Sequence, residues 1–182
     1  MTITNLPEAL QSSALAPLFL DIDKPDIKKT EDPDATIVRF KLKSLLPIDD
    51  DKALKFILIE NQNTIHLIIP HVAHSKEMEF VARVGHVNKM VNVGRVYWDP
   101  EDGEIGIDWV ILKSDENAES VQTIEYVMAC VIQIYATESL YFLTKNLEMA
   151  EIPQATIKPI IEAAKKEFNE IFKPALDSVL SD

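Results

Sequence analysis

The fold follows most directly from one stretch of sequence, Lys55-Phe56-Ile57-Leu58-Ile59-Glu60, Asn61-Gln62-Asn63, Thr64-Ile65-His66-Leu67-Ile68-Ile69. Two runs rich in β-branched residues flank a short turn that contains asparagine, a pattern typical of a β-hairpin. Pro70 follows the second run, and we expect it to end the strand because proline cannot donate to a ladder of hydrogen bonds. The stretch therefore predicts two neighbouring strands of an antiparallel sheet.

A third strand is expected just before this hairpin, over residues 36–43. Val38, Phe40 and Leu42 point to one face, and the intervening basic residues point to the other. Such alternation indicates a sheet with one covered face and one wet face. Residues 1–34 are interpreted as a lead-in with a short helix near Leu6-Pro7, followed by a loop over residues 21–34 that holds Pro25 and Pro33.

A helix and a second hairpin follow the first one. Ser75 is the expected N-cap, and the helical face is formed by Phe80, Val84, Val87 and Val91. Gly94 is expected to stop the helix. The second hairpin is predicted to comprise Arg95–Trp98, a turn over residues 99–103 and a strand over residues 104–112.

Two helices are predicted to close the chain, one over residues 118–147 and one over residues 156–180. Pro153 separates them, and Pro174 is expected to kink the second. The order of elements predicts an α+β fold, with a five-stranded antiparallel sheet, helices packed on one face, and an extra C-terminal helix. We divide the chain into a lead-in (1–34), an α+β domain (35–150) and a C-terminal amphipathic helix (151–182).

Composition excludes some functions. The 182 residues carry a formal net charge of −12, and their basic residues are scattered, which argues against nucleic acid as a partner. The apolar runs Ala14–Leu20 and Tyr126–Ile132 are too short to cross a bilayer, so no membrane association is expected. Cys130 is the only cysteine, which favours a reducing cytoplasm.

No motif for catalysis, metal or cofactor stands out. His71 and His74, with Glu77 and Glu79 beyond them, form the tightest cluster of ligand types, but no third zinc ligand is specified. The acidic turn at residues 99–104 lacks the spacing of an EF-hand. We therefore expect a protein that is not an enzyme and has no cofactor, with no catalytic residues and no metal ligands. The alternative is an enzyme or small-ligand binder whose site is assembled from distant residues, such as His66, His71 or Arg95.

One segment indicates a partner. Residues 126–132 are apolar all round the predicted helix, and one sheet face can cover only part of such a helix. The cover could come from the last helix of the same chain, from a second copy or from a client protein. A homodimer with a two-fold axis is expected. The residues predicted to bind a partner through an apolar groove are Tyr126, Val127, Ile134, Ile160, Phe168, Ile171 and Phe172.

The run Asn88-Lys89-Met90-Val91-Asn92-Val93-Gly94-Arg95-Val96-Tyr97-Trp98-Asp99-Pro100-Glu101-Asp102-Gly103-Glu104-Ile105 resembles the signature of YbjN-type proteins. The resemblance covers roughly residues 35–145 and matches the predicted order of elements. It implies a fold like that of type III secretion chaperones, often dimeric and without catalytic machinery. Bacterial members are described as sensory or stress regulators, and cyanobacteria carry related forms. The resemblance thus implies a chaperone-like or adaptor protein.

Within this run, we expect a structural role for six residues: Gly94, Arg95, Tyr97, Asp99, Asp102 and Gly103. The two glycines are expected at positive φ, where side chains other than hydrogen are disfavoured. Arg95 is expected to pair with a carboxylate of its own hairpin, such as Asp99 or Glu104.

Overall fold

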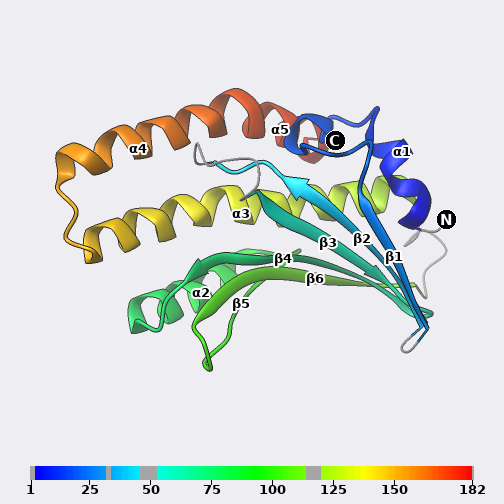
Figure 1. Cartoon of the computed structure of the whole chain (residues 1–182), viewed down its shortest axis with the longest axis horizontal. Coiled ribbons are helices and arrows are strands. Elements are labelled where there is room, and N and C mark those ends of the chain that lie inside the picture. The colour runs from blue at the N-terminus through cyan, green and yellow to red at the C-terminus, as the bar shows by residue number, and fades with distance from the viewer. Residues whose placement is uncertain (1–2, 32–33, 46–52, 114–119, 182) are drawn as a thin grey trace.

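Six antiparallel strands form one sheet, in the order β1-β2-β3-β4-β6-β5 (Figure 1). The structure is a computed structural model that describes residues 3–31, 34–45, 53–113 and 120–181. The strands are β1 (Asp26–Glu31), β2 (Asp34–Leu42), β3 (Leu54–Glu60), β4 (Thr64–His74), β5 (Arg95–Trp98) and β6 (Glu104–Leu112). The longer helices are α2 (Met78–Met90), α3 (Val121–Met149), α4 (Gln154–Glu167) and α5 (Lys173–Leu180). The predicted α+β fold with an antiparallel sheet is confirmed.

The sixth strand, β1, lies where the sequence predicted a loop. It pairs with β2 at the edge of the sheet, and nearly all of its residues are exposed. An edge strand with two wet faces needs no apolar alternation, so its sequence, Asp-Ile-Lys-Lys-Thr-Glu, carries no periodic signal. The expected count of five strands was wrong for this reason. Pro33 of the predicted loop lies outside the described residues.

The first predicted hairpin is confirmed as β3 and β4. The turn is closed by Asn61, whose Oδ1 accepts from the backbone amides of Asn63 at 2.9 Å and Thr64 at 2.8 Å. Pro70 does not end β4, which continues to His74 through a bulge. At the bulge, β4 advances from Ile69 to Ala73 while β6 advances only from Ile107 to Ile105. Proline fits here because a bulge leaves residues out of the ladder.

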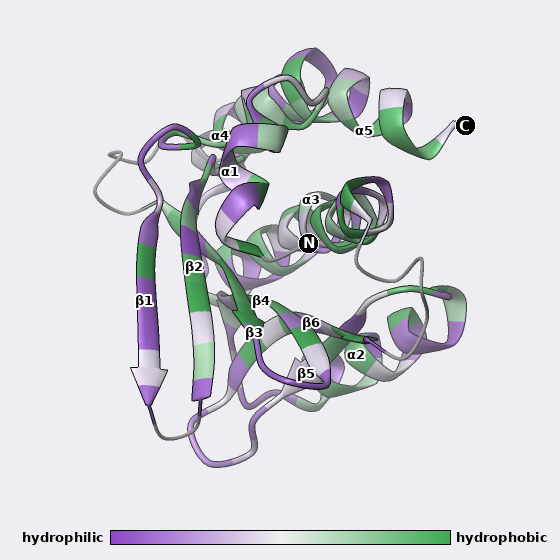
Figure 2. Ribbon diagram, turned by 90° about the vertical axis from the view of Figure 1, so that its right-hand side faces the viewer, coloured by the Kyte–Doolittle hydropathy of each residue, from purple (hydrophilic) through white to green (hydrophobic). Residues whose placement is uncertain are grey.

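The longer helices lie on one side of the sheet. In Figure 1, α3 runs along the strands with α4 and α5 above it, and Figure 2 shows the sheet curving beneath α3. The inner residues of the central strands are fully buried, among them Phe56, Leu58, Leu67 and Ile107. Helix α2 packs beside β5, and its Phe80 ring stacks on that of Phe142 of α3, with 5.4 Å between the ring centroids.

Two predicted helix boundaries shift by a few residues. Helix α2 begins at Met78, and Ser75 does not cap it: the Ser75 hydroxyl accepts from the amide of Glu77, the residue before the helix. Helix α2 also ends at Met90, so it stops before Gly94 is reached. In α3, by contrast, Ser120 is a true N-cap, accepting from the amide of Thr123 at 3.0 Å. Residues 118 and 119 of the predicted helix lie outside the described residues.

The C-terminal segment folds back over α3. A π-helical turn, Phe168–Phe172, joins α4 to α5, so the disturbance expected at Pro174 lies just before it. A π turn suits this place because proline cannot supply the amide of an ordinary helical hydrogen bond. Ala164, Phe172 and Leu176 are buried in the common core, and the centroid of the Phe172 ring lies 6.1 Å from that of Tyr135 on α3.

The lead-in joins the same core. Ile3, Leu6 and Leu10 are completely buried, and the amide of Ile3 donates to the carboxylate of Glu60 on β3 at 3.0 Å. The three segments distinguished in the sequence therefore share one hydrophobic core. Helix α3 contains an 18-residue window apolar enough to cross a membrane, but 56% of that window is buried within this fold, as in the core helix of a soluble protein.

Candidate functional site

The apolar groove expected along α3 is occupied by the chain itself. Of the residues predicted to bind a partner, Phe172 is completely buried, and Val127 and Ile134 are buried as well. The half-buried members lie on the returning C-terminal segment and are Ile160, Phe168 and Ile171. Tyr126 is the exposed member, with 47% of its surface accessible. Intrachain cover, one of the three alternatives, accounts for most of this surface.

The second hairpin has the geometry expected of its glycines. Gly94 has φ 93° and Gly103 has φ 91°. Two aspartates brace the turn: Asp99 Oδ1 accepts from the amide of Glu101, and Asp102 Oδ1 accepts from the amide of Glu104, both at 2.8 Å. These aspartates satisfy backbone amides, which is a structural role.

Asn88 ties helix α2 to the hairpin. Its side chain donates to the carbonyl of Val96 and accepts from the amide of Val96, each at 2.8 Å. The carboxamide thus pairs with the free edge of β5 as a neighbouring strand would, which explains why an asparagine belongs in this run.

Arg95 pairs with a carboxylate of its own hairpin, but with neither Asp99 nor Glu104. Its guanidinium donates two hydrogen bonds to Asp108 on β6, at 2.9 and 2.7 Å, and His66 Nε2 of β4 lies 3.2 Å from the same carboxylate. The two named residues were wrong because the register of β5 and β6 sets Arg95 directly opposite Asp108. Hydrogen bonding to Asp108 raises the pKa of Arg95, so the guanidinium stays charged.

A second polar group continues along the same face. The Tyr97 hydroxyl donates to Glu104 at 2.7 Å, and His71 Nδ1 lies 3.0 Å from the other oxygen of that carboxylate. The Tyr97 ring lies against Gly106, where a Cβ would clash with it. Burial, reinforced by the neighbouring Glu104, raises the pKa of Tyr97, which is therefore neutral.

The cluster of histidines and glutamates does not converge on a metal site. His71 and His74 line a shallow pocket with Asp102 and Glu104, but no group of three or more ligating side chains could hold a metal ion within the described residues. Glu79 instead accepts from Tyr141 and pairs with Lys145, whose hydrogen bond lowers the pKa of Glu79.

The lone cysteine lies away from these groups, on α3. Cys130 is only partly buried, and its burial raises the pKa of the thiol. A protonated thiol is a weak nucleophile.

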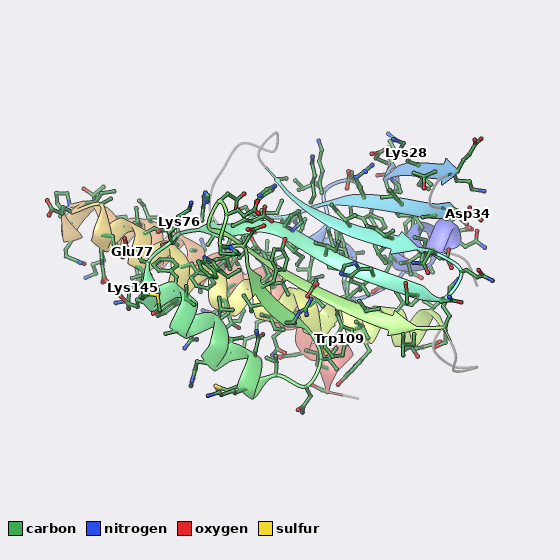
Figure 3. The ribbon with its side chains drawn as sticks, turned by 90° about the horizontal axis from the view of Figure 1, so that it is seen from below. Lys28, Asp34, Lys76, Glu77, Trp109 and Lys145 are labelled. Atoms are coloured by element: carbon green, nitrogen blue, oxygen red, sulfur yellow. The ribbon has the colours of Figure 1, made fainter. Side chains whose placement is uncertain are left out.

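The face of the sheet opposite α3 is apolar at its centre. We call it the open face: it is viewed from below in Figure 3, with the strands in front of the long helices. Strand pairing sets Ile37 beside Ile59 and Ile57 beside Ile68 on this face. On β6, Val110 is 42% exposed and lies opposite His66 of β4, and Leu112 is 62% exposed and lies opposite Thr64. These six aliphatic residues, with His66 and Thr64 between those of β3 and those of β6, form a surface that no described element covers.

Charged residues surround that surface. The basic side chains of the open face belong to Lys28, Arg39, Lys41, Lys55 and Arg95, and the acidic ones to Asp26, Glu104 and Asp108. Each acid has a partner: Asp26 pairs with Arg39 at 2.8 Å, Asp108 with Arg95 and Glu104 with His71. The three lysines form no ion pair with any described residue. On this strongly acidic protein, three of the five basic residues of the open face thus lack a carboxylate partner within the described part of the chain.

A signal for this face exists in the sequence. The runs in β3 and β4 are nearly continuous in aliphatic residues instead of alternating, which indicates that both faces of those strands are apolar.

No protein-family model matches the chain, and comparison with curated proteins finds no match to its sequence.

Proposed function

We propose that this protein is a non-enzymatic, protein-binding module that docks an acidic amphipathic helix of a partner on its open face. One observation carries the proposal: half-buried isoleucines form the centre of that face, and three lysines without carboxylate partners among the described residues lie around it. An aliphatic patch on a sheet is unusual unless something covers it.

The dimensions of the open face suit a helix. Neighbouring strands of a sheet lie about 4.8 Å apart. A helix with its side chains is about 10 Å across. The strands β2, β3, β4 and β6 are adjacent, so together they are wider than one helix.

The order of residues across the face suggests how such a helix would lie. An aliphatic stripe on the helix would lie over Ile57 and Ile68. Glutamates or aspartates flanking the stripe would reach Lys28, labelled at the edge of the sheet in Figure 3, and Lys41 and Lys55 at one end.

The lysines themselves favour an anionic partner. Lys41 and Lys55 lie directly opposite one another on β2 and β3, and like charges in that position repel. A bound carboxylate between them removes the repulsion. Complementary charge of this kind gives specificity and speeds association, more than it adds affinity.

The resemblance to YbjN-type proteins supports the proposal. The elements from β2 to α3 follow the order implied for YbjN-type proteins, which supports a fold like that of type III secretion chaperones and an adaptor or regulatory role. A cytoplasmic location is part of the proposal and is supported by the lone thiol of Cys130.

A homodimer is also proposed, at a surface other than the groove predicted for it. Contacts within the chain already cover much of that groove, since three of its residues are buried and three are half-buried. On the open face, a second copy would compete with the acidic partner helix, and it is the less favoured occupant at low salt because two chains of net charge −12 repel each other. Light scattering measures the mass of the protein in solution and so distinguishes a second copy of the chain from a different partner.

The test uses two synthetic peptides and matched variants of the full chain. One peptide is a helix with a leucine stripe flanked by glutamates, and the other has lysines in place of the glutamates. Fluorescence anisotropy should show that the acidic peptide binds and the basic peptide does not. Binding of the acidic peptide should weaken as the salt concentration rises, because the lysines are exposed and salt screens their charge. Ile57→Asp should weaken binding about tenfold or more. Met78→Asp, on the exposed start of α2, should not change it.

The proposal fails if the acidic peptide does not bind, or if Ile57→Asp and Met78→Asp behave alike. Circular dichroism confirms that each variant is folded. A wild-type dimer that becomes a monomer with Ile57→Asp would show that a second copy occupies the face. If single-stranded RNA binds to the wild-type chain and this binding is lost in Lys41→Glu, the ligand of the open face is nucleic acid and not an acidic protein.

A further inference from the structure

A pocket of about 290 Å³ lies on the covered side of the sheet, between β3, β4, α3 and α4. The bulge at Pro70 and His71 moves β4 out of register with β6 just where the pocket forms, and His71 has a φ of 56° there. Ala73, Ser139 and Ala164 are the small residues that line it from the strand and the two helices. The space therefore results from the bulge together with three short side chains.

The lining is mostly apolar and contains a buried hydroxyl without a partner among the described residues. Leu54, Val72, Leu140 and Leu143 supply apolar surface. The Ser139 hydroxyl is buried and has no hydrogen-bond partner among the described residues. A buried hydroxyl without a hydrogen bond is unfavourable in free energy. A bound molecule that hydrogen-bonds to Ser139 would remove this cost, since the described part of the chain provides no partner.

The Tyr135 hydroxyl does not serve that purpose. It accepts from the amide of Leu45 at 3.3 Å, which holds the wall of the pocket in place. The Asn146 carboxamide, two turns along α3 from Ser139, also belongs to the lining, and its side chain makes no hydrogen bond to another described residue. Ser139 and Asn146 thus offer a donor and an acceptor on the α3 side of the pocket, whose other polar lining residues are Ser44, His71 and Tyr135.

The charge of the lining selects a neutral ligand. No lysine or arginine is among the described residues that line the pocket, and His71 is engaged with Glu104. Burying an anion there would leave its charge unpaired, which is strongly unfavourable. A cavity about twice the size of one that holds benzene fits a ligand of roughly ten non-hydrogen atoms.

We propose that this pocket binds a neutral, medium-chain molecule with a single polar end, such as an aliphatic alcohol or ketone, whose oxygen bonds to the Ser139 hydroxyl. The chain of the ligand lies among Leu54, Val72 and Leu143. The site is separate from the open face, since it lies between the sheet and α3, so each proposal can fail without the other.

The test measures binding of 1-octanol to the full chain by titration calorimetry and by the shift in melting temperature. Saturable binding is expected, with octanoate at pH 8 binding more weakly. Ala164→Leu should fill the pocket and weaken octanol binding about tenfold or more. Ala163→Leu, on the exposed neighbouring position of α4, is the matched control and should bind as wild type does.

Ser139→Ala provides the second variant. Losing one hydrogen bond should weaken octanol binding about threefold to tenfold. The ligand-free variant should be at least as stable as wild type, because an unpaired buried hydroxyl is removed. A serine with a purely structural hydrogen bond would instead lower the melting temperature when it is replaced.

Three results would overturn the proposal. They are a lack of saturable octanol binding, equal binding by Ala164→Leu and Ala163→Leu, and tighter binding of octanoate than of octanol. If Ala164→Leu does not fold, unchanged octanol affinity in Ser139→Ala is the decisive contrary result.

Discussion

The two faces of the sheet use the same strands differently. Residues that alternate along β3 show the contrast: Phe56 and Leu58 are fully buried beneath α3, while Ile57 and Ile59 on the open face are only half-buried. Each side of the sheet also has an arginine with two hydrogen bonds to a carboxylate: on the covered side Arg83 bonds to Glu138, and on the open face Arg95 bonds to Asp108. The comparison separates buried side chains, which stabilise the fold, from side chains of the same strands that remain partly exposed.

The largest difference is expected between neighbouring aliphatic residues. Leu58→Ala should lower the free energy of unfolding by about 3–4 kcal/mol, because it leaves a cavity in a packed core. Ile57→Ala should cost about 1 kcal/mol, since little packing is lost on a face open to water. Urea unfolding at pH 7 measures both. Equal losses would show that the open face is part of the stabilising core.

The second-largest difference in stability is expected between substitutions of the two arginines. Arg83→Leu leaves Glu138, 4% exposed, without its partner, and should cost about 2–3 kcal/mol, below the value for a fully buried pair because Arg83 is partly accessible. Arg95→Leu should cost about 1 kcal/mol, since His66 remains beside Asp108. Thermal unfolding of the two variants tests this order, and a larger loss for Arg95→Leu would reverse it.

Two glycines allow a smaller comparison. Gly94 has positive φ and faces Ile134 of α3. Gly94→Ala should therefore cost about 1 kcal/mol or more, from backbone strain together with a clash. Gly106→Ala, on the open face, would clash with the Tyr97 ring but adds no strain from a positive φ, and should cost less than Gly94→Ala.

Gly85→Ala is the control for these two variants. Gly85 is a helical position with open space around it, so alanine should leave stability unchanged or raise it slightly through its better helix propensity. Melting temperatures rank the three variants. An unchanged melting temperature for Gly94→Ala would contradict the role given to this glycine.

The smallest expected effect is a loss of stability at alkaline pH when Tyr135 ionises in the unfolded chain. Burial in the core raises the pKa of Tyr135 to about 12. A phenol whose pKa is higher in the folded state contributes stability below its ordinary pKa, near 10, and that contribution is lost as pH rises from about 10 to 12. Between pH 8 and pH 11 the loss should be about 1 kcal/mol. Urea unfolding of Tyr135→Phe should lack this part of the pH dependence, and an identical profile would refute the assignment.

Several features were predictable from the sequence because they depend on near neighbours. The β3–β4 hairpin, the positive φ of Gly94 and Gly103, and the apolar faces of α2 and α3 all follow from residues within a turn or a hairpin of one another. For the candidate site, the sequence predicted one wet face, and that prediction missed the signal of the continuous aliphatic runs in β3 and β4 that both faces of these strands are apolar. The lysines that surround the open face could be named only once the strand register was known.

Other features depend on contacts between distant parts of the chain. β1 forms because β2 offers an edge to pair with, although the strand has no apolar period of its own. The partner of Arg95 is Asp108 because of cross-strand register, and Phe172 lies in the core because α4 and α5 fold back over α3. Local propensity selects helix or strand from the pattern of a segment. Which surfaces meet is decided by the burial available across the whole chain, and that depends on all segments at once.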